Sequence, residues 1–531
     1  MLTRVRRRFR DPVFLTAVAA ALIAFAVQSG DVDSADTVRR LQTTHSFWTS
    51  APPVLPDDYP DFGLQGRRGR IYAWYGIGQS LLMLPSDIVG TYLEGLPVFA
   101  NYNGNDPSVR NIVVSYSTNI LVNVLTALVV LRLLLLLGFE IRQAVAGAFA
   151  LLLCTTHLHY TQNMMENNYI LLLTLTGFAF QYEWLKTGSQ RALLFGSAAL
   201  GLNLLTRLTT GMDLIAVGMF VALDLWFEQL RGQTLWKRLA SYLRTALPVY
   251  IFFILMDRLY QYYRFGSWFN TYMNVFAQQQ RRLNPVLPPN YPFETPFHVG
   301  FFGALFSAEK SVFLFDPLLL LTILLSVLLW GRLRPEIRAY LISVCLLILG
   351  YICFYARYTV WSGDSAWGDR YVSSVVELAA FVSVPFLLRH RADIGRVVWI
   401  LGLGLIAISG AVQVASVAFW LPLELYQMTT LGHPTFVVGL RFKNIVAFSL
   451  GKMDAWGLTN DDMKTDPWDY VHITTWNILP SMLRRVGAAP HWACRLTLFI
   501  WLGGLAMLGW ILKTLTSVLA DGGEEPAATL S

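Results

Sequence analysis

Residues 112–137 read IVVSYSTNILVNVLTALVVLRLLLLL, an apolar run whose only charged residue is Arg132. A run of about 20 apolar residues is long enough to cross the hydrocarbon core of a bilayer as one helix. Similar runs recur along the chain, which has 531 residues, 55% hydrophobic residues, 14% charged residues and a mean hydropathy of +0.46. A soluble domain carries about 25% charged residues. The composition therefore excludes a soluble enzyme and a disordered protein, and it predicts an all-α integral membrane protein.

The apolar runs predict about twelve transmembrane helices, connected by extracytoplasmic loops and juxtamembrane helices. The first span is expected at residues 12–27. Residues 75–93 contain several glycines and Pro85, so they are expected to form a helix on the outer membrane surface and not a span. The remaining predicted spans are residues 112–137, 143–160, 168–185, 191–207, 211–227, 245–261, 311–330, 338–356, 371–389, 397–416 and 493–513.

Lysine and arginine in alternate loops set the predicted orientation. Met1–Arg10 carries five arginines before the first span, which places the N-terminus in the cytoplasm; a cleaved signal peptide is the alternative. The short loops predicted on the cytoplasmic side are each basic, as the positive-inside rule requires. Both termini are then cytoplasmic. The three large segments 29–111, 262–310 and 417–492 fall outside, so the work of the protein is expected on the extracytoplasmic side.

The stretch from Gln28 to Asp36 ends the first span with three carboxylates, at positions 31, 33 and 36. A carboxylate beside hydrocarbon loses solvation, which moves its pKa toward the range of a general base. Asp31 lies nearest the apolar run and is our candidate catalytic residue, with Asp33 beside it. A helix cap or solvated surface acids would explain the same pattern. Asp31 and Asp33 could also hold a divalent cation through oxygen ligands.

Charged residues at the outer ends of the spans are candidates for binding a lipid phosphate, because Arg and Lys are suited to that anion. Lys310 and Arg370 are the first choices, and Arg207 is the third. Glu166 lies at the same predicted level. For any single one of these residues, a side chain that merely reaches the interface is an alternative. Trp268 belongs to a predicted rim of aromatic residues suited to sugar faces.

Several motifs in order resemble the polytopic glycosyltransferases of the C superfamily, the group of the protein O-mannosyltransferases and the aminoarabinose transferase that modifies lipid A. An acidic motif after the first span matches Ser29-Gly30-Asp31. The other matching segments are Tyr75–Pro85, Leu204–Thr209, Leu305–Pro317 and Trp361–Tyr371. The likeness covers nearly the whole transmembrane region and fades after about residue 420. Residues 308, 309 and 369 depart from the usual pattern, with Ala-Glu and Asp in place of Pro-Gly and Pro.

The resemblance implies a sugar donor on a polyprenyl phosphate. Asp31 would deprotonate or orient the acceptor hydroxyl, while Lys310 and Arg370 would neutralise the departing phosphate. By the same likeness Tyr75, Trp361 and Tyr371 join Glu166 and Trp268 in the substrate groove. The resemblance is also compatible with a metal ion that assists the reaction, as in the oligosaccharyl and arabinosyl branches of the superfamily. Nucleotide sugars stay in the cytosol, so an enzyme working outside needs a donor carried by a lipid.

The predicted organisation has three parts. Residues 1–420 form the transmembrane catalytic region, with the first outer loop at 29–111 and the next at 262–310. Residues 421–492 form an extracytoplasmic segment expected to select the acceptor, with Trp456, Trp468 and Trp476 as packing anchors. Residues 493–531 hold the last span and a cytoplasmic tail.

Two other functions fit the sequence less well. One is a lipid or sugar transporter or flippase; the other is a polysaccharide polymerase or ligase using His433, His472 or His491. The net charge of +7 does not indicate nucleic-acid binding, because the basic residues sit in small groups between apolar runs. The outer loops contain no Asn-x-Ser/Thr sequon, which favours a bacterial inner membrane. The expected partners are the bilayer, the lipid-linked donor and a lipid, glycan or protein acceptor.

Overall fold

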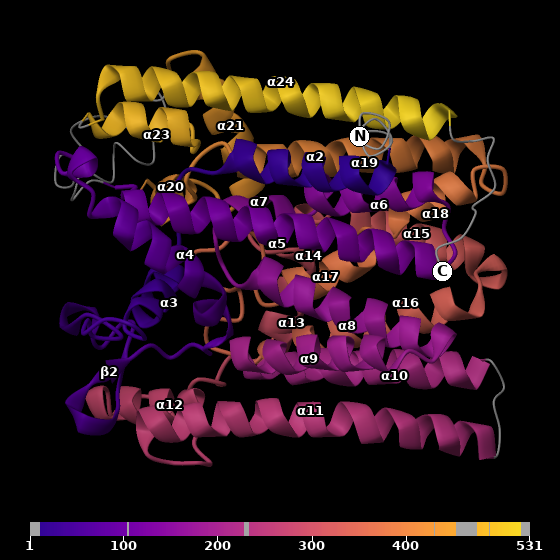
Figure 1. Cartoon of the computed structure of the whole chain (residues 1–531), viewed down its shortest axis with the longest axis horizontal. Helices are drawn as coiled ribbons and strands as arrows, with labels where there is room; N and C mark the ends of the chain where they lie inside the picture. The colour runs from indigo at the N-terminus through magenta and orange to yellow at the C-terminus, as the bar shows by residue number, and fades with distance from the viewer. Residues whose placement is uncertain are drawn as a thin grey trace, which may run out of the picture.

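The computed structural model describes residues 11–102, 106–227, 233–429, 431–452, 475–487 and 489–521, and it is built almost entirely of helices. Long helices run side by side along one axis, as Figure 1 shows. The helices of the first half are α2 (Pro12–Val27), α3 (Ala35–His45), α4 (Gly78–Glu94), α5 (Val109–Leu136), α6 (Ile141–Cys154), α7 (His157–Gln162), α8 (Asn167–Thr187), α9 (Gln190–Thr206), α10 (Gly211–Phe227) and α11 (Gln233–Phe265).

The second half continues the same bundle. Its helices are α12 (Tyr272–Leu283), α13 (Phe297–Phe306), α14 (Val312–Phe315), α15 (Leu318–Leu329), α16 (Pro335–Tyr355), α17 (Ser373–Ala380), α18 (Ser383–Arg389), α19 (Arg396–Ser416), α20 (Pro422–Thr429), α21 (Val437–Ser449), α23 (Leu479–Val486) and α24 (His491–Asp521). One small antiparallel pair, β1 (Leu64–Gln65) and β2 (Ile71–Tyr72), forms in the first outer loop.

All twelve predicted spans coincide with helices, but three of them are broken. The run 143–160 divides into α6 and α7, the run 311–330 into α14 and α15, and the run 371–389 into α17 and α18. Within the described residues, six helices are long and apolar enough to cross a membrane, by length and composition only. Shorter apolar helices accompany them, among them α2 and α6. The predicted surface segment 75–93 is also helical, as α4.

Helix α8 lies at the centre of the bundle and is buried along nearly its whole length. It packs against α5, α9 and α10. Its polar Thr174 is satisfied by a buried network, because Asp213 accepts hydrogen bonds from Thr174 Oγ1 at 2.7 Å and from Tyr351 OH at 2.9 Å. Asn203 Nδ2 donates to the same carboxylate at 3.2 Å. The network ties α8, α9, α10 and α16 together close to Arg207, the residue that follows α9.

The long loops gather at one end of the bundle, as the topology predicted from the charges of alternate loops requires. In Figure 1 the labels α3, α4, β2, α12, α20 and α23 cluster at the left end, while the right end has short connections such as the one after α18.

Asp87 helps to hold the first outer loop together. Its buried carboxylate accepts from Trp48 Nε1 at 2.8 Å and lies 3.1 Å from His45 Nδ1, and it pairs with Arg110 at 2.5 Å.

The segment after residue 416 folds onto the same end. Arg441 and Glu424 form a fully buried ion pair with an Nε–Oε1 distance of 2.7 Å, and Arg441 also donates to backbone carbonyls at the end of α19. Trp476 stacks on Phe419 with ring centroids 5.0 Å apart. Trp456, Trp468 and His472 lie outside the described residues, as do the arginines of Met1–Arg10.

Candidate functional site

A cavity of about 340 Å³ lies at the end of the bundle where the outer loops gather. Its charged lining residues are Asp36, Arg40, Asp61, Glu166, Arg207, Asp364 and Arg370. Its aromatic lining residues are Phe62, Trp74, Tyr75, Tyr272, Phe276, Tyr355, Tyr358 and Tyr371. These residues come from three outer loops and from the ends of α8, α9 and α16, so the cavity forms where those loops fold over the bundle.

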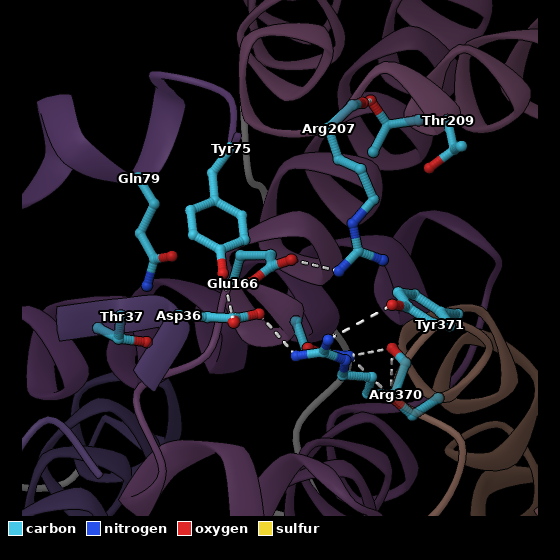
Figure 2. A network of polar contacts seen from close by, with 12 residues as sticks. Asp36, Thr37, Tyr75, Gln79, Glu166, Arg207, Thr209, Arg370 and Tyr371 are labelled. Atoms are coloured by element: carbon cyan, nitrogen blue, oxygen red, sulfur yellow. Dashed lines mark hydrogen bonds and ion pairs between the residues drawn. The ribbon is translucent and has the colours of Figure 1, made fainter. Parts of the chain in front are cut away.

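Asp36 and Arg370 meet inside this cavity, as Figure 2 shows. Arg370 Nη1 lies 2.6 Å from Asp36 Oδ2, and the Tyr75 hydroxyl donates to Asp36 Oδ1 at 2.5 Å. Burial raises the pKa of Tyr75, and the neighbouring Asp36 carboxylate raises it further, so this phenol stays a donor. The Asp36 carboxylate is thus held in place by the charged guanidinium group of Arg370 and the neutral hydroxyl group of Tyr75.

Glu166 holds two guanidinium groups at the same level. Its carboxylate pairs with Arg40 Nη1 at 2.7 Å and with Arg207 Nη2. Burial alone would raise the pKa of Glu166, but Arg40 and Arg207 outweigh it and hold the pKa well below its usual range. Glu166 therefore stays ionised, and it fixes arginines from two different helix ends, α3 and α9.

The turn that carries Glu166 is positioned by the first outer loop. Thr37 Oγ1 donates to the Met164 carbonyl at 2.7 Å, and Gln79 Nε2 donates to the same carbonyl at 2.8 Å. On the other side, Asn167 Nδ2 donates to the Arg370 carbonyl at 2.5 Å. These contacts lock α3, α4, α8 and the Arg370 loop into one arrangement around the cavity.

The paired charges of the cavity lining are three guanidinium groups and two carboxylates, and the lining also contains the carboxylates of Asp61 and Asp364. Arg40, Arg207 and Arg370 supply three guanidinium groups, whereas Asp36 and Glu166 supply two carboxylates. Guanidinium groups suit phosphate because their planar donors can bind two oxygens at once. The three guanidinium groups are therefore chemically suited to an anionic phosphate beside the Asp36 carboxylate.

Five of the residues predicted from the sequence meet in the cavity: Tyr75, Glu166, Arg207, Arg370 and Tyr371. Tyr371 stacks on Tyr355 with ring centroids 4.3 Å apart and an interplanar angle of 7°. Both Arg207 and Arg370 lie over the Tyr371 ring, at 5.4 and 5.2 Å from its centroid. The ring thus orients both guanidinium groups.

Asp31 and Asp33 are not among the residues that line the cavity. Asp31 Oδ1 accepts from its neighbour Val32 N at 2.6 Å and from Asn111 Nδ2 at 3.3 Å. Asp33 accepts from Ser29 Oγ at 3.2 Å, and burial together with the charge of Asp31 raises its pKa well above the usual value. Asp36 from the same acidic stretch is the carboxylate that lines the cavity, and the catalytic role of Asp31 and Asp33 stays a prediction.

Lys310 is also absent from the cavity lining, and its ammonium group contacts the backbone. The side chain is buried, and Nζ donates to the carbonyls of Asp364 at 2.6 Å, Ala366 at 2.8 Å and Gly368 at 3.4 Å. An ammonium group has three donors, so all three have backbone partners. Burial lowers the pKa of Lys310 to about 8. Lys310 thus braces the loop that presents Arg370, and its predicted contact with a phosphate stays a prediction.

The two predicted tryptophans lie outside the cavity lining. Trp268 stacks on Tyr262 with ring centroids 4.7 Å apart. Trp361 packs against Gly303, where an added Cβ would come within 2.2 Å of its ring. His433 and His491 are also absent from the lining. Within the described ranges, no group of three or more His, Cys, Asp or Glu side chains is arranged to hold a metal ion.

Arg40, Asp61 and Asp364 are lining residues that the sequence analysis did not single out. A signal for Arg40 was present: it follows Asp36 by four residues, so in a helix the two side chains share one face. Asp61 and Asp364 carry no such signal, because their positions depend on how separate loops fold.

Comparison with solved structures finds similar chains at low sequence identity. ArnT from Cupriavidus metallidurans in the apo state is 14% identical, with 95% of this chain and 77% of that chain covered and a TM-score of 0.45. ArnT from the same organism bound to undecaprenyl phosphate is 15% identical, with 96% and 78% covered and a TM-score of 0.43.

The apo oligosaccharyltransferase of Archaeoglobus fulgidus is 13% identical, with 75% of this chain and 55% of that chain covered and a TM-score of 0.40. No family profile and no curated protein matches the sequence. We therefore base the function on the residues of this chain.

Proposed function

We propose that the protein is a membrane glycosyltransferase that moves a sugar from a polyprenyl-phosphate donor to an acceptor hydroxyl. The acceptor is a lipid, a glycan or a protein. The observation that carries the proposal is the meeting of Asp36 with Arg370, 2.6 Å apart, in a cavity at the loop-covered end of the helical bundle. A carboxylate beside clustered guanidinium groups supplies both a proton acceptor and a site for a leaving phosphate.

In the proposed reaction the acceptor oxygen attacks the anomeric carbon, and the bond from that carbon to the phosphate oxygen breaks. The acceptor proton passes to the carboxylate of Asp36. The phosphate leaves with the bonding electron pair and gains a negative charge, which Arg370 and Arg207 stabilise. Tyr75 keeps Asp36 oriented through its hydroxyl. Asp36 thus takes the role that the sequence analysis gave to Asp31.

The arrangement of the bundle supports a donor delivered by lipid. The cavity lies where helices of membrane-spanning length end, so a phosphate bound there leaves its hydrocarbon chain at the level of the bilayer. We place this end on the extracytoplasmic side of a bacterial inner membrane, with both termini in the cytoplasm. A nucleotide sugar would not reach the site from the cytosol, whereas a lipid carrier would.

The test compares two carboxylates of the same stretch in purified protein. Wild type, Asp36→Asn and Asp31→Asn are given radiolabelled undecaprenyl-phosphate sugars and a membrane extract as the source of acceptor. Asp36→Asn should lower transfer by about 10²- to 10⁴-fold, the range that general-base catalysis contributes. Asp31→Asn should retain most of the activity.

Three results would contradict parts of this proposal. Equal transfer by wild type and Asp36→Asn would remove Asp36 from the reaction. Loss of transfer only in Asp31→Asn would return the role of base to Asp31. Movement of labelled lipid across vesicles without any sugar transfer would indicate a flippase.

A further inference from the structure

Two carboxylates in the cavity have no part in the reaction proposed above. Asp61 belongs to the first outer loop, and Asp364 belongs to the loop between α16 and α17. Both residues are exposed, in contrast to the buried Glu166. Neither carboxylate makes a hydrogen bond or ion pair with another residue in the part of the chain that the structure describes. Their oxygen atoms are therefore available to a bound molecule.

The backbone at Asp364 adopts a left-handed conformation. Its φ is +55°, in the region that residues other than Gly, Asn and Asp seldom occupy. The Asp364 carbonyl accepts from Lys310 Nζ at 2.6 Å and from Ala366 N at 2.7 Å, so a buried ammonium group holds the turn in place. Such conformations persist where the surroundings enforce them, and they cluster at ligand sites.

Aromatic rings accompany the two carboxylates in the lining of the cavity. Phe62 follows Asp61 directly, and Trp74 and Phe276 meet edge to face with ring centroids 4.7 Å apart. Carboxylate oxygens accept hydrogen bonds from hydroxyl groups, and aromatic rings cover apolar surface. Sugars offer both surfaces, because their rings carry hydroxyl groups at the edge and C–H groups on the face.

The charges of the cavity also restrict the donor. Arg40, Arg207 and Arg370 attract a phosphate, whereas the carboxylates of Asp61 and Asp364 repel an acidic group. The phosphate of a donor is therefore drawn to the arginines, and a further acidic group on its sugar is repelled.

We infer that Asp61 and Asp364 form the sugar subsite and select a sugar that carries no acidic group. This inference rests on the function proposed above and names the class of its donor sugar. Neutral sugars donate hydroxyl hydrogen bonds to both carboxylates. Uronic acids and phosphorylated sugars are repelled by them.

The test measures binding to purified protein in detergent by displacement of radiolabelled undecaprenyl phosphate. The competitors are unlabelled undecaprenyl phosphate and its glucosyl, mannosyl, galactosyl and glucuronosyl forms. Wild type should bind at least one neutral sugar lipid about tenfold more tightly than the bare lipid phosphate, and the glucuronosyl lipid more weakly than its neutral counterpart. Asp364→Asn and Asp61→Asn should each remove most of the gain from the neutral sugar, with binding of the bare lipid unchanged or slightly tighter.

A matched pair of variants separates binding from folding. Asn and Gly both accept the left-handed conformation, so Asp364→Asn and Asp364→Gly keep the turn. Asp364→Gly should be as thermally stable as wild type or more stable, yet bind the neutral sugar lipid about tenfold more weakly. A residue with only a structural role would show no selective loss of the sugar lipid.

The outcomes distinguish this inference from the function on which it rests. If wild type fails to bind undecaprenyl phosphate and all four sugar lipids, the glycosyltransferase proposal itself is wrong. If lipid phosphate binds but no neutral sugar improves binding, or if the Asp variants bind every lipid like wild type, the sugar subsite is wrong. Equal weakening of bare and sugar-bearing lipids would also overturn it.

Discussion

Glu166 is a single carboxylate that two buried arginines share, and this makes it a critical ion-pairing residue of the cavity. Removing one partner of a buried ion pair leaves uncompensated charge, at a cost of about 3–5 kcal/mol. We expect Glu166→Gln to leave Arg40 and Arg207 repelling each other and to lower the free energy of unfolding by roughly that amount. Thermal denaturation in detergent measures the change.

The control for this prediction is Glu183→Gln. Glu183 pairs with Arg132 at 2.6 Å, but 47% of the Arg132 side chain is exposed. Exposed pairs contribute about 0.2–1 kcal/mol, so Glu183→Gln should be nearly neutral. Equal destabilisation by the two substitutions would contradict the prediction that Glu166→Gln leaves uncompensated charge on Arg40 and Arg207.

Lys310 gives a pH dependence with opposite signs for activity and stability. Its pKa is lowered from 10.5 to about 8 by burial. Above pH 8 the folded protein loses the ammonium charge that braces the Arg370 loop, so activity should fall. Between pH 8 and 10.5 the unfolded chain binds more protons at this residue than the folded chain does, so its contribution to the free energy of unfolding should rise with pH.

Lys310→Met isolates these effects, because methionine has a similar length and no titrating group. The difference in thermal stability between wild type and Lys310→Met should shift in favour of wild type as the pH rises from 8 to 10. The alkaline fall in transfer activity near pH 8 should be absent from the residual activity of the variant. A wild-type profile flat through pH 9 would contradict the role of the ammonium group as the brace.

At the scale of elements, the segment that leads into α4 packs against the end of α9 through Gly76. A Cβ at this position would lie 2.2 Å from the Leu205 carbonyl oxygen and 2.4 Å from that of Thr206. Gly76 lies between Tyr75 and α4, and Thr206 precedes Arg207, so a forced separation would move both cavity residues. We expect Gly76→Ala to lower transfer by about 10²-fold, as displacements of about 1 Å do.

Gly218→Ala on α10 is the matched control, because a Cβ there would meet nothing within 4 Å. Alanine in place of glycine inside a helix stabilises by about 0.5–1 kcal/mol. The control should therefore keep full transfer activity and melt at the same temperature or slightly higher. Full activity in Gly76→Ala would mean that the contact between α4 and α9 does not set the cavity.

The helices could be placed from the sequence because a run of about 20 apolar residues is a local signal. Their breaks could not, since they depend on distant partners. The Thr156 amide donates to Asp316 Oδ1 at 2.7 Å, which joins the breaks in two predicted spans, 143–160 and 311–330. Nothing near either residue in the sequence reveals that contact.

The acidic stretch after the first span supplies a carboxylate to the cavity, but Asp31, the residue predicted to be catalytic, does not line it. The chain turns at Gly30 and Asp33, both with positive φ, before α3 begins. Gly30 packs against Leu479, where a Cβ would approach within 2.6 Å. Because this turn is set by a segment far along the chain, the sequence could not show that Asp36, and not Asp31, lines the cavity.

At the scale of the whole molecule, the two ends of the bundle differ in chemistry. One end carries the outer loops and the cavity, and the other carries arginines in short connections. Those arginines include Arg332, which pairs with Asp393 at 2.6 Å, and Arg334, which pairs with Glu336. Basic residues in short loops are typical of the cytoplasmic side. The positive-inside rule therefore predicts that the cavity end faces outward.

This orientation can be measured with two single cysteines in a background where the four native cysteines are replaced by alanine. Arg282 on α12 is exposed at the cavity end, and Ala392 is exposed in the connection after α18 at the opposite end. In intact spheroplasts a membrane-impermeant maleimide should label Arg282→Cys and leave Ala392→Cys unlabelled until the cells are lysed. The reverse pattern would place the cavity in the cytoplasm, where nucleotide sugars could reach it and the need for a lipid-linked donor would disappear.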